Sequence, residues 1–489
     1  MSEPGAPSDR RSVLVLTYRW PPQGGGGVQR TLKFVKYLGR FGWHPVVHTV
    51  ANPYAPLWDA SLESEVPRDV AVYRTPTLEF ESLEAGAAEV ARRVARLVRG
   101  ARGGGGTRSE EKRAAPAPQA RAADGDDAAG LGERAARLKG GGALARVQDW
   151  IWSRLLVPDP QIVWLPGALV RSVAIARRHG ASVLYSTAPP QSLNVLALAI
   201  QRRVGIPWVA DLRDPWTAGL HRNQWYPDHP RRRAREERWE RLIFERASHV
   251  IVVTEAAREE FLAKYPWCPP DRVSVITNGF DPADFARVSP TPRFLEAGKL
   301  NVTVTGHVET LFDLVPFFEA VREVVEANAE DRATLRVNFV GTRRQPRYDA
   351  WIAERALGDV IRYHPYVPHA DSVQYLTDSQ VLMLCMTPVK EYGAVKILGK
   401  MCEYLYTRKP VLALTIPGVT SRILEAAGVG ITIDPSHVGA MRDTLRRFLA
   451  ELRAGGLRVS PNEDVIASFD RERQAAALAR ILDHAAKPA

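Results

Sequence analysis

Cysteine is scarce in this sequence, which has only three such residues in 489. Cys268, Cys385 and Cys402 are spaced neither as a zinc site nor as a disulfide framework, so we expect inert thiols in a reducing compartment. Apolar runs are also short, and none approaches the roughly 18 residues that a membrane-spanning helix requires. The N-terminal residues MSEPGAPSDRR lack the apolar stretch of a secretory signal. These absences predict a cytoplasmic protein without a membrane-spanning helix.

Charge and composition exclude several classes of protein without identifying a partner. The formal net charge of +11 attracts nucleic acid, anionic lipid and phosphorylated small molecules alike. No helix-turn-helix, zinc-finger or aromatic RNA-binding motif accompanies the arginines, which argues against nucleic acid as the partner. Hydrophobic residues at 45% and charged residues at 25% are typical of folded globular proteins, so collagen-like and coiled-coil structures are excluded.

Short apolar runs alternate with helical patterns in two series, and such alternation predicts parallel sheets covered by helices on both faces. In residues 1–290 the expected strands are 12–17, 44–50, 70–74, 182–186, 208–210, 249–253 and 273–276. In residues 291–465 they are 300–305, 335–340, 360–363, 381–385, 410–414 and 430–433. The predicted fold class is therefore α/β, with two Rossmann-like αβα domains. Residues 466–489 contain an amphipathic helix that we expect to pack back toward the N-terminal domain.

A long interruption separates the third expected strand from the fourth. Residues 100–142 contain glycine runs and the segments APAPQ and DGDD with almost no bulky apolar residue, so we expect a disordered insertion. Just before it, apolar residues recur at helical spacing over residues 83–102 and are flanked by arginines. Such a helix lies either on an anionic membrane surface or on its own domain with the arginines in solvent, and the sequence leaves both alternatives open.

A glycine-rich loop follows the first expected strand. The segment PPQGGGGVQR begins at Pro21 and leads into a helical pattern from Val28. Backbone N–H groups at a helix N-terminus favour an anion or sugar hydroxyls, and glycines let a ligand approach closely. A tight turn without a ligand is the alternative. The candidate substrate-binding residues of this segment are Gly25, Gly26, Gly27 and Arg30.

Charged residues follow the strand expected at 208–210, in the segment DLRDPW. Ligands of open α/β sheets bind beyond the carboxyl ends of the strands, so these side chains are placed for a polar substrate. Internal salt bridges of Arg213 are the alternative. The candidate catalytic residues of this segment are Asp211, Arg213 and Asp214.

Lys400 and Glu403 lie about one turn apart on a helix predicted to end before Pro410. A lysine at this position can neutralise a diphosphate, and a carboxylate can accept hydrogen bonds from ribose hydroxyls. The pair therefore indicates a helix face that binds a nucleotide.

The chain resembles glycosyltransferase family 4 in segments taken in order: GGGGVQRTLKFVKYLGRFGWHPVV, STAPPQSLNVLALAIQRRVGIPWVADLRDPWT, SHVIVVTEAAREEF with ITNGFDPADF, and KMCEYLYTRKPVLAL. The resemblance covers nearly the whole chain outside residues 82–148. It implies the GT-B fold, in which the two domains face each other across a cleft. It also implies a nucleotide-sugar donor, UDP- or GDP-linked, on the C-terminal domain, an acceptor on the N-terminal domain, and neither metal nor cofactor.

The resemblance also implies roles for individual residues. Glu403 matches the second glutamate of the family's paired motif, which contacts the donor ribose, whereas Val395 stands at the position of the first. The arginine and lysine that many relatives use to hold the diphosphate are absent after the strand expected at 300–305. Alternative donor-binding residues are Arg343, Arg344, Lys396 and Lys400. Gly306 is a further donor-site candidate, and His307 is a catalytic candidate by its loop position.

Together these features predict a retaining, hexosyltransferase-type glycosyltransferase of polysaccharide or glycan biosynthesis, with a saccharide or polyprenyl-linked saccharide as acceptor. Front-face transfer requires no protein nucleophile, so catalysis would rest on positioning and on stabilising the departing diphosphate. The basic helix adds an anionic membrane surface as a candidate partner, with attachment to the inner face of the cytoplasmic membrane. An epimerase or a phosphorylase of the same fold, and a noncatalytic subunit that supports a partner transferase, remain as alternatives.

Overall fold

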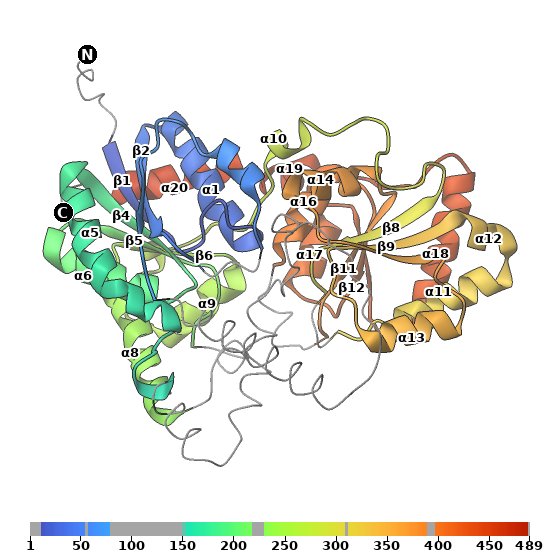
Figure 1. The fold of residues 1–489 in the computed structure, drawn as a ribbon, viewed down its shortest axis with the longest axis horizontal. Coiled ribbons are helices and arrows are strands. Elements are labelled where there is room, and N and C mark those ends of the chain that lie inside the picture. Colours follow the sequence, from blue (N-terminus) through green and yellow to red (C-terminus); the bar gives the residue numbers. More distant parts are fainter. Residues whose placement is uncertain are drawn as a thin grey trace, which may run out of the picture.

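The computed structural model describes residues 11–53, 57–78, 150, 152–217, 229–308, 312–388 and 397–487. Two αβα domains stand side by side, each built on its own parallel sheet, so the predicted fold class is confirmed (Figure 1). The insertion expected at 100–142 and the basic helix expected at 83–102 lie outside the described residues. Within the described ranges, no helix combines the length and hydropathy needed to cross a membrane.

The sheet of the N-terminal domain has seven strands in the order β3-β2-β1-β4-β5-β6-β7, all of whose pairings are parallel. Its strands are β1 (Arg11–Leu16), β2 (Trp43–Val50), β3 (Val72–Thr75), β4 (Ala181–Ala188), β5 (Trp208–Leu212), β6 (His249–Val252) and β7 (Val273–Val275). Alternate residues of β1 enter two cores, because Leu14 and Leu16 pack on one face and Val13 and Val15 on the other. Helices therefore cover both faces.

The sheet of the C-terminal domain has six strands in the order β10-β9-β8-β11-β12-β13, again paired in parallel. Its strands are β8 (Leu300–Thr305), β9 (Leu335–Val340), β10 (Ile361–His364), β11 (Val381–Cys385), β12 (Val411–Leu414) and β13 (Gly430–Ile433). Each was expected from a short apolar run, because a strand buried on both faces carries apolar residues almost continuously.

The helices of the N-terminal part are α1 (Gly26–Leu38), α5 (Leu165–Arg178), α6 (Ser192–Val204), α8 (Pro230–Arg246), α9 (Glu255–Lys264) and α10 (Pro282–Phe285). The C-terminal part has α11 (Val315–Ala327), α12 (Ala329–Thr334), α13 (Pro346–Glu354), α14 (His369–Asp378), α16 (Gly399–Thr407), α17 (Val419–Ala426), α18 (Val438–Arg453), α19 (Glu463–Ala467) and α20 (Arg471–Ala485). Short 3-10 turns occur as η1 (Gly39–Phe41), η2 (Ala60–Glu65), η3 (Pro160–Trp164) and η4 (Pro270–Arg272).

The last helix, α20, packs on the N-terminal domain although it follows the C-terminal domain in sequence (Figure 1, red helix beside α1). Leu478 and Leu482 of α20 share a buried core with Val28 and Leu32 of α1. The carboxylate of Asp470 caps the helix by accepting from the backbone N–H groups of the first turn. The chain thus returns to the domain from which it started.

The two connections between the domains touch where they cross. Phe280 of the outgoing segment forms a parallel β-bridge with Asp470 of the returning segment. A Cβ placed on Gly279 would lie 2.2 Å from the carbonyl oxygen of Phe469, so only glycine allows this approach.

Candidate functional site

The strand order reverses at one place in each sheet, where parallel α/β sheets leave a crevice for ligands. In the N-terminal domain β1 lies between β2 and β4, and in the C-terminal domain β8 lies between β9 and β11. The loop beyond β1 contains the glycine run, and the loop beyond β8 begins at Gly306 and His307. Both loops were singled out from the sequence.

The glycine-rich loop contacts the C-terminal domain. Gly24 donates its N–H to the carbonyl of Leu57 at 2.9 Å, and Asp59 donates to the carbonyl of Pro22 at 2.8 Å. The carboxylate of Asp59 accepts the backbone N–H of His369 at 2.9 Å, and a Cβ built on Gly24 would lie 3.0 Å from the Tyr366 hydroxyl oxygen. The glycine-rich loop before α1 therefore faces the loop that follows β10.

The N-terminus of α1 is open to a ligand. Gly25, the residue before the helix, has φ +93°, a conformation that glycine adopts without strain, and no side chain caps the helix. Gly26 is exposed and Gly27 is partly exposed. The N–H groups of Gly26 and Gly27 lie at this open helix end, where an anion or a sugar hydroxyl can approach them.

Arg30 and Asp211 require a correction of the predicted roles, because the structure buries both side chains and pairs them with each other. The guanidinium donates through Nε and Nη2 to the two carboxylate oxygens at 2.8 and 2.9 Å. Burial lowers the pKa of Arg30, but Asp211 outweighs this effect and raises it. Hydroxyls of Tyr185 and Thr187 also donate to Asp211. Asp211 is fully buried and its carboxylate accepts four hydrogen bonds from the protein, so it is not accessible to a substrate.

Arg213 holds the loops at the switch point instead of forming the internal salt bridge considered from the sequence. Its guanidinium donates to the carbonyls of Gly27 at 2.8 Å, Ala188 at 3.2 Å and Pro189 at 2.5 Å. Burial lowers the pKa of Arg213. Asp214 is partly exposed and remains the carboxylate of this segment that can meet an acceptor.

The far end of the same segment is held by a buried carboxylate that the sequence analysis missed. Glu240 of α8 accepts the N–H and the hydroxyl of Thr217 at 2.9 and 2.8 Å, the hydroxyl of Tyr265, and the ammonium of Lys264.

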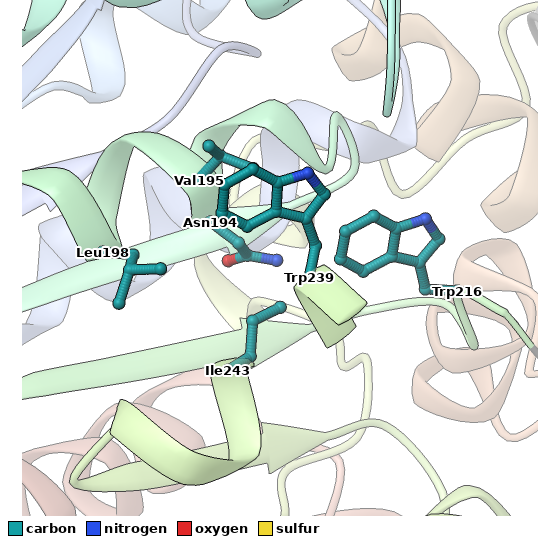
Figure 2. Close-up of a pocket in the computed structure, with 6 residues that line it drawn as sticks. All are labelled: Asn194, Val195, Leu198, Trp216, Trp239 and Ile243. Carbon is teal, nitrogen blue, oxygen red and sulfur yellow. The ribbon is translucent and has the colours of Figure 1, made fainter. Parts of the chain in front are cut away.

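Trp216, the residue before Thr217, lines a small pocket, in which every other lining group except Asn194 is apolar (Figure 2). The remaining lining residues are Val195, Leu198, Trp239 and Ile243. This pocket contains no charged group to bind a phosphate.

In the C-terminal domain, α16 holds the loop that follows β8. Lys400 donates to the carbonyls of Thr305 at 2.9 Å and His307 at 2.6 Å. Gly306, between these two residues, is exposed and has φ +69°. The ammonium therefore orients the backbone of the loop after β8, and His307 is partly exposed in the same loop.

Glu403 lies one turn further along α16 and contacts a histidine that the sequence analysis missed. Its Oε1 is 2.9 Å from Nε2 of His369, the first residue of α14. Burial alone would lower the pKa of His369, but the carboxylates of Glu403 and Asp284 outweigh it and raise the pKa to about 9. The available signal was that His369 follows the carboxyl end of a strand, as ligand-binding residues do in such sheets.

A cluster of charges lies next to this histidine and involves both domains. Lys33 of α1 pairs with Glu65 at 2.5 Å, with Asp281 at 3.0 Å and with Asp284. Ligand atoms of Glu65, Asp284 and His369 lie within 4.8 Å of one another, a spacing suited to a metal ion. The ammonium of Lys33 already supplies a positive charge among these acids, so we interpret the cluster as an ion-pair network.

The other predicted donor-binding residues lie beyond β9 or outside the described part of the chain. Arg343 is exposed after β9, and Arg344 pairs with Asp349 at 3.1 Å. Lys396 and Val395 lie outside the described residues. Gly341, at the end of β9, is close to the donor loop, because a Cβ on it would lie 4.0 Å from Cα of Gly306.

Two αβα domains whose switch-point loops face each other define the GT-B fold, and solved structures confirm it. Sucrose-phosphate synthase of Thermosynechococcus elongatus is 15% identical with a TM-score of 0.57, covering 97% of this chain and 99% of that one. Anabaena Alr3699/HepE is 13% identical with a TM-score of 0.53, covering 96% and 99%. The N-terminal domain of trehalose-6-phosphate phosphatase from Candida albicans is 9% identical with a TM-score of 0.55, covering 99% of both chains. These identities establish the fold alone.

A sequence comparison finds a family model that matches part of the chain. The model of Glycosyltransferase Family 4 matches residues 131–284, so the resemblance to this family is confirmed over that part of the chain. No curated protein matches the sequence.

Replacing Asp211 by Asn is expected to lower the free energy of unfolding by about 3–5 kcal/mol, because it leaves the Arg30 charge buried without its partner. Urea unfolding followed by tryptophan fluorescence measures this loss. The matched control is Glu472→Gln, which removes the acid of the exposed Arg40 pair at 2.7 Å and should cost at most about 1 kcal/mol. Equal losses for the two variants would contradict a structural role of the buried pair.

Proposed function

We propose that this chain is a retaining glycosyltransferase that moves a sugar from a nucleotide sugar to a saccharide acceptor in glycan or polysaccharide biosynthesis. The observation that carries the proposal is the partly exposed Glu403 carboxylate on α16, the helix whose Lys400 holds the loop after β8. Glu403 also contacts His369, which is hydrogen-bonded to Asp59 of the N-terminal domain. The Anabaena structure of similar fold is a complex with UDP and glucose, which supports a UDP-sugar as donor, with a GDP-sugar as the alternative.

In the proposed complex the donor lies on the C-terminal domain. Glu403 accepts hydrogen bonds from the ribose hydroxyls, and the exposed backbone at Gly306 approaches the diphosphate. Lys400 and Arg343 supply positive charge to this group, with Lys396 as a further candidate. Because these cations and backbone N–H groups can stabilise the departing diphosphate, the proposed reaction needs no metal.

The acceptor is proposed to lie on the N-terminal domain, between the glycine-rich loop and Asp214. Front-face transfer requires only that the acceptor hydroxyl and the sugar carbon be held in contact, and His307 and Asp214 are the side chains best placed to orient that hydroxyl. Arg213 and Arg30 contribute by fixing the loops around it. Closure of the two domains excludes water and so limits hydrolysis of the donor.

The finer points of the proposal are a hexose as the transferred sugar, a polyprenyl-linked saccharide as acceptor, and a position on the inner face of the cytoplasmic membrane. They rest on the family resemblance and on the basic helical pattern of residues 83–102.

Calorimetric titration with UDP, GDP and ADP should show selective binding of one nucleotide, and Glu403→Ala should weaken it by roughly 10- to 100-fold, the effect of losing hydrogen bonds to a charged group. Glu425→Ala is the matched control, because Glu425 is an exposed glutamate of the same domain. No binding of any nucleotide by folded protein would favour a noncatalytic subunit.

Retention predicts that the product keeps the anomeric configuration of the donor sugar. Incubating the protein with the sugar nucleotide of the base selected by calorimetry and a saccharide acceptor, followed by proton NMR, reads this configuration directly. An inverted product would contradict the front-face reaction, and an epimerised donor without transfer would indicate an epimerase.

Attachment to a membrane predicts salt-sensitive binding to vesicles that contain anionic lipid, since each arginine near such a surface contributes about 1 kcal/mol. Deleting residues 83–102 should abolish sedimentation with these vesicles, and vesicles of phosphatidylcholine alone serve as the control. Unchanged binding of the deletion variant would remove this segment from the proposal.

A further inference from the structure

His369 contacts both sides of the cleft with two different groups. Its ring nitrogen Nε2 lies 2.9 Å from Oε1 of Glu403, within the C-terminal domain. Its backbone N–H donates to Oδ2 of Asp59, in the N-terminal domain, at 2.9 Å. A displacement of one domain against the other therefore acts on a residue that is hydrogen-bonded to the Glu403 carboxylate.

The contact continues into the glycine-rich loop. Asp59 precedes η2 and donates its own N–H to the carbonyl of Pro22 at 2.8 Å, while Gly24 donates to Leu57 at 2.9 Å. Asp59 is buried, and its other carboxylate oxygen accepts from the N–H and hydroxyl of Ser61. An unbroken series of hydrogen bonds consequently joins Glu403 to the loop before α1.

The Glu403 carboxylate is held on one side and open on the other. Only Oε1 has a hydrogen-bond partner among the described residues, and the side chain of Glu403 remains 20% exposed. A glutamate has three rotatable side-chain bonds, so one hydrogen bond to a nearly buried ring restricts the directions in which Oε2 points. Oε2 is the atom left for a ligand hydroxyl.

We propose that His369 is a positioning residue that fixes the Glu403 carboxylate for the donor ribose and connects it, through Asp59, to the glycine-rich loop of the other domain. This inference rests on the proposed function, because it assigns Glu403 to the donor. His369 itself touches neither donor nor acceptor.

Charges around His369 keep the contact ionic at neutral pH. Glu403 faces it from α16 and Asp284 from α10, and these carboxylates together raise the pKa of His369 to about 9 against the effect of burial. The ammonium of Lys33 on α1 acts in the opposite direction and lowers the pKa of His369. Glu65 of η2 and Asp59, just before η2, are further carboxylates near His369. Lys36 and Asp281 pair with each other at 2.7 Å beside Lys33. Below pH 9 the protonated ring therefore donates a charge-assisted hydrogen bond, which becomes a weaker neutral one as the pH rises through 9.

The first test measures nucleotide affinity by calorimetry at pH 7.5 with UDP, GDP and ADP. His369→Ala should weaken the nucleotide that the wild type binds by about tenfold, the effect of losing one charge-assisted hydrogen bond. His369→Gln should stay within about threefold of the wild type, because its amide nitrogen corresponds to Nε2 and donates at the same place. His437→Ala, at an exposed histidine before α18, is the control and should change nothing.

Two further readouts separate positioning from folding. The affinity of the wild type should fall between pH 8 and 10, whereas that of His369→Gln should not follow this profile. In a Glu403→Ala background, adding His369→Ala should cause no further loss, since the histidine acts through that carboxylate.

The outcomes separate the inference from the function on which it rests. A wild type that binds none of the three nucleotides overturns the proposed function and the inference together. A wild type that binds, with His369→Ala unchanged, overturns the inference alone. Additive effects of the two substitutions also overturn the inference alone, as does a His369→Gln variant that binds as weakly as His369→Ala while its thermal unfolding matches the wild type.

Discussion

The buried ion pair between Arg30 and Asp211 is the interaction on which the N-terminal half of the cleft depends. It joins α1 to the end of β5, and the third nitrogen of the same guanidinium donates to the carbonyl of Thr277, in the segment that leaves for the second domain. The start of α1, the loop beyond β5 and the interdomain connection therefore share one buried charge. Because an unpaired charge in this interior is costly, the elements hold their relative positions.

The two domains are joined by contacts of different strength. The crossing of the chain at Gly279 and Phe469 and the packing of α20 on α1 are tight and largely apolar. Across the cleft, the backbone N–H of His369 donates to the carboxylate of Asp59, next to the ion pairs of the buried Lys33 with Glu65 and Asp284. Apolar packing resists separation, whereas a polar contact broken between the domains is replaced by hydrogen bonds to water, so closure and opening are expected to break the His369–Asp59 contact and keep the apolar packing.

The sequence was sufficient for the fold because its signals are local. Strands such as β9, β11 and β13 coincide with apolar runs, and the glycine loop and the α16 face lie where strand ends and helix spacing placed them. The pairing of side chains was not accessible in this way. Asp211 looked like a catalytic acid because it ends a strand, but its partner Arg30 is 181 positions away. His369 was missed for the same reason, because its role depends on the contact with Glu403, which the local sequence does not show.

Burial and hydrogen bonding of each carboxylate together separate structural acids from those that can bind a ligand. A carboxylate accepts about four hydrogen bonds. Asp211 and Glu240 each accept four from the protein and are buried, so both have only a structural use for their charge. Glu403 accepts one from the described residues and is partly exposed. The same sequence feature, an acid near a strand or helix at the cleft, thus serves a structural role in one case and can bind a ligand in the other, and burial together with the hydrogen bonds already made distinguishes the two.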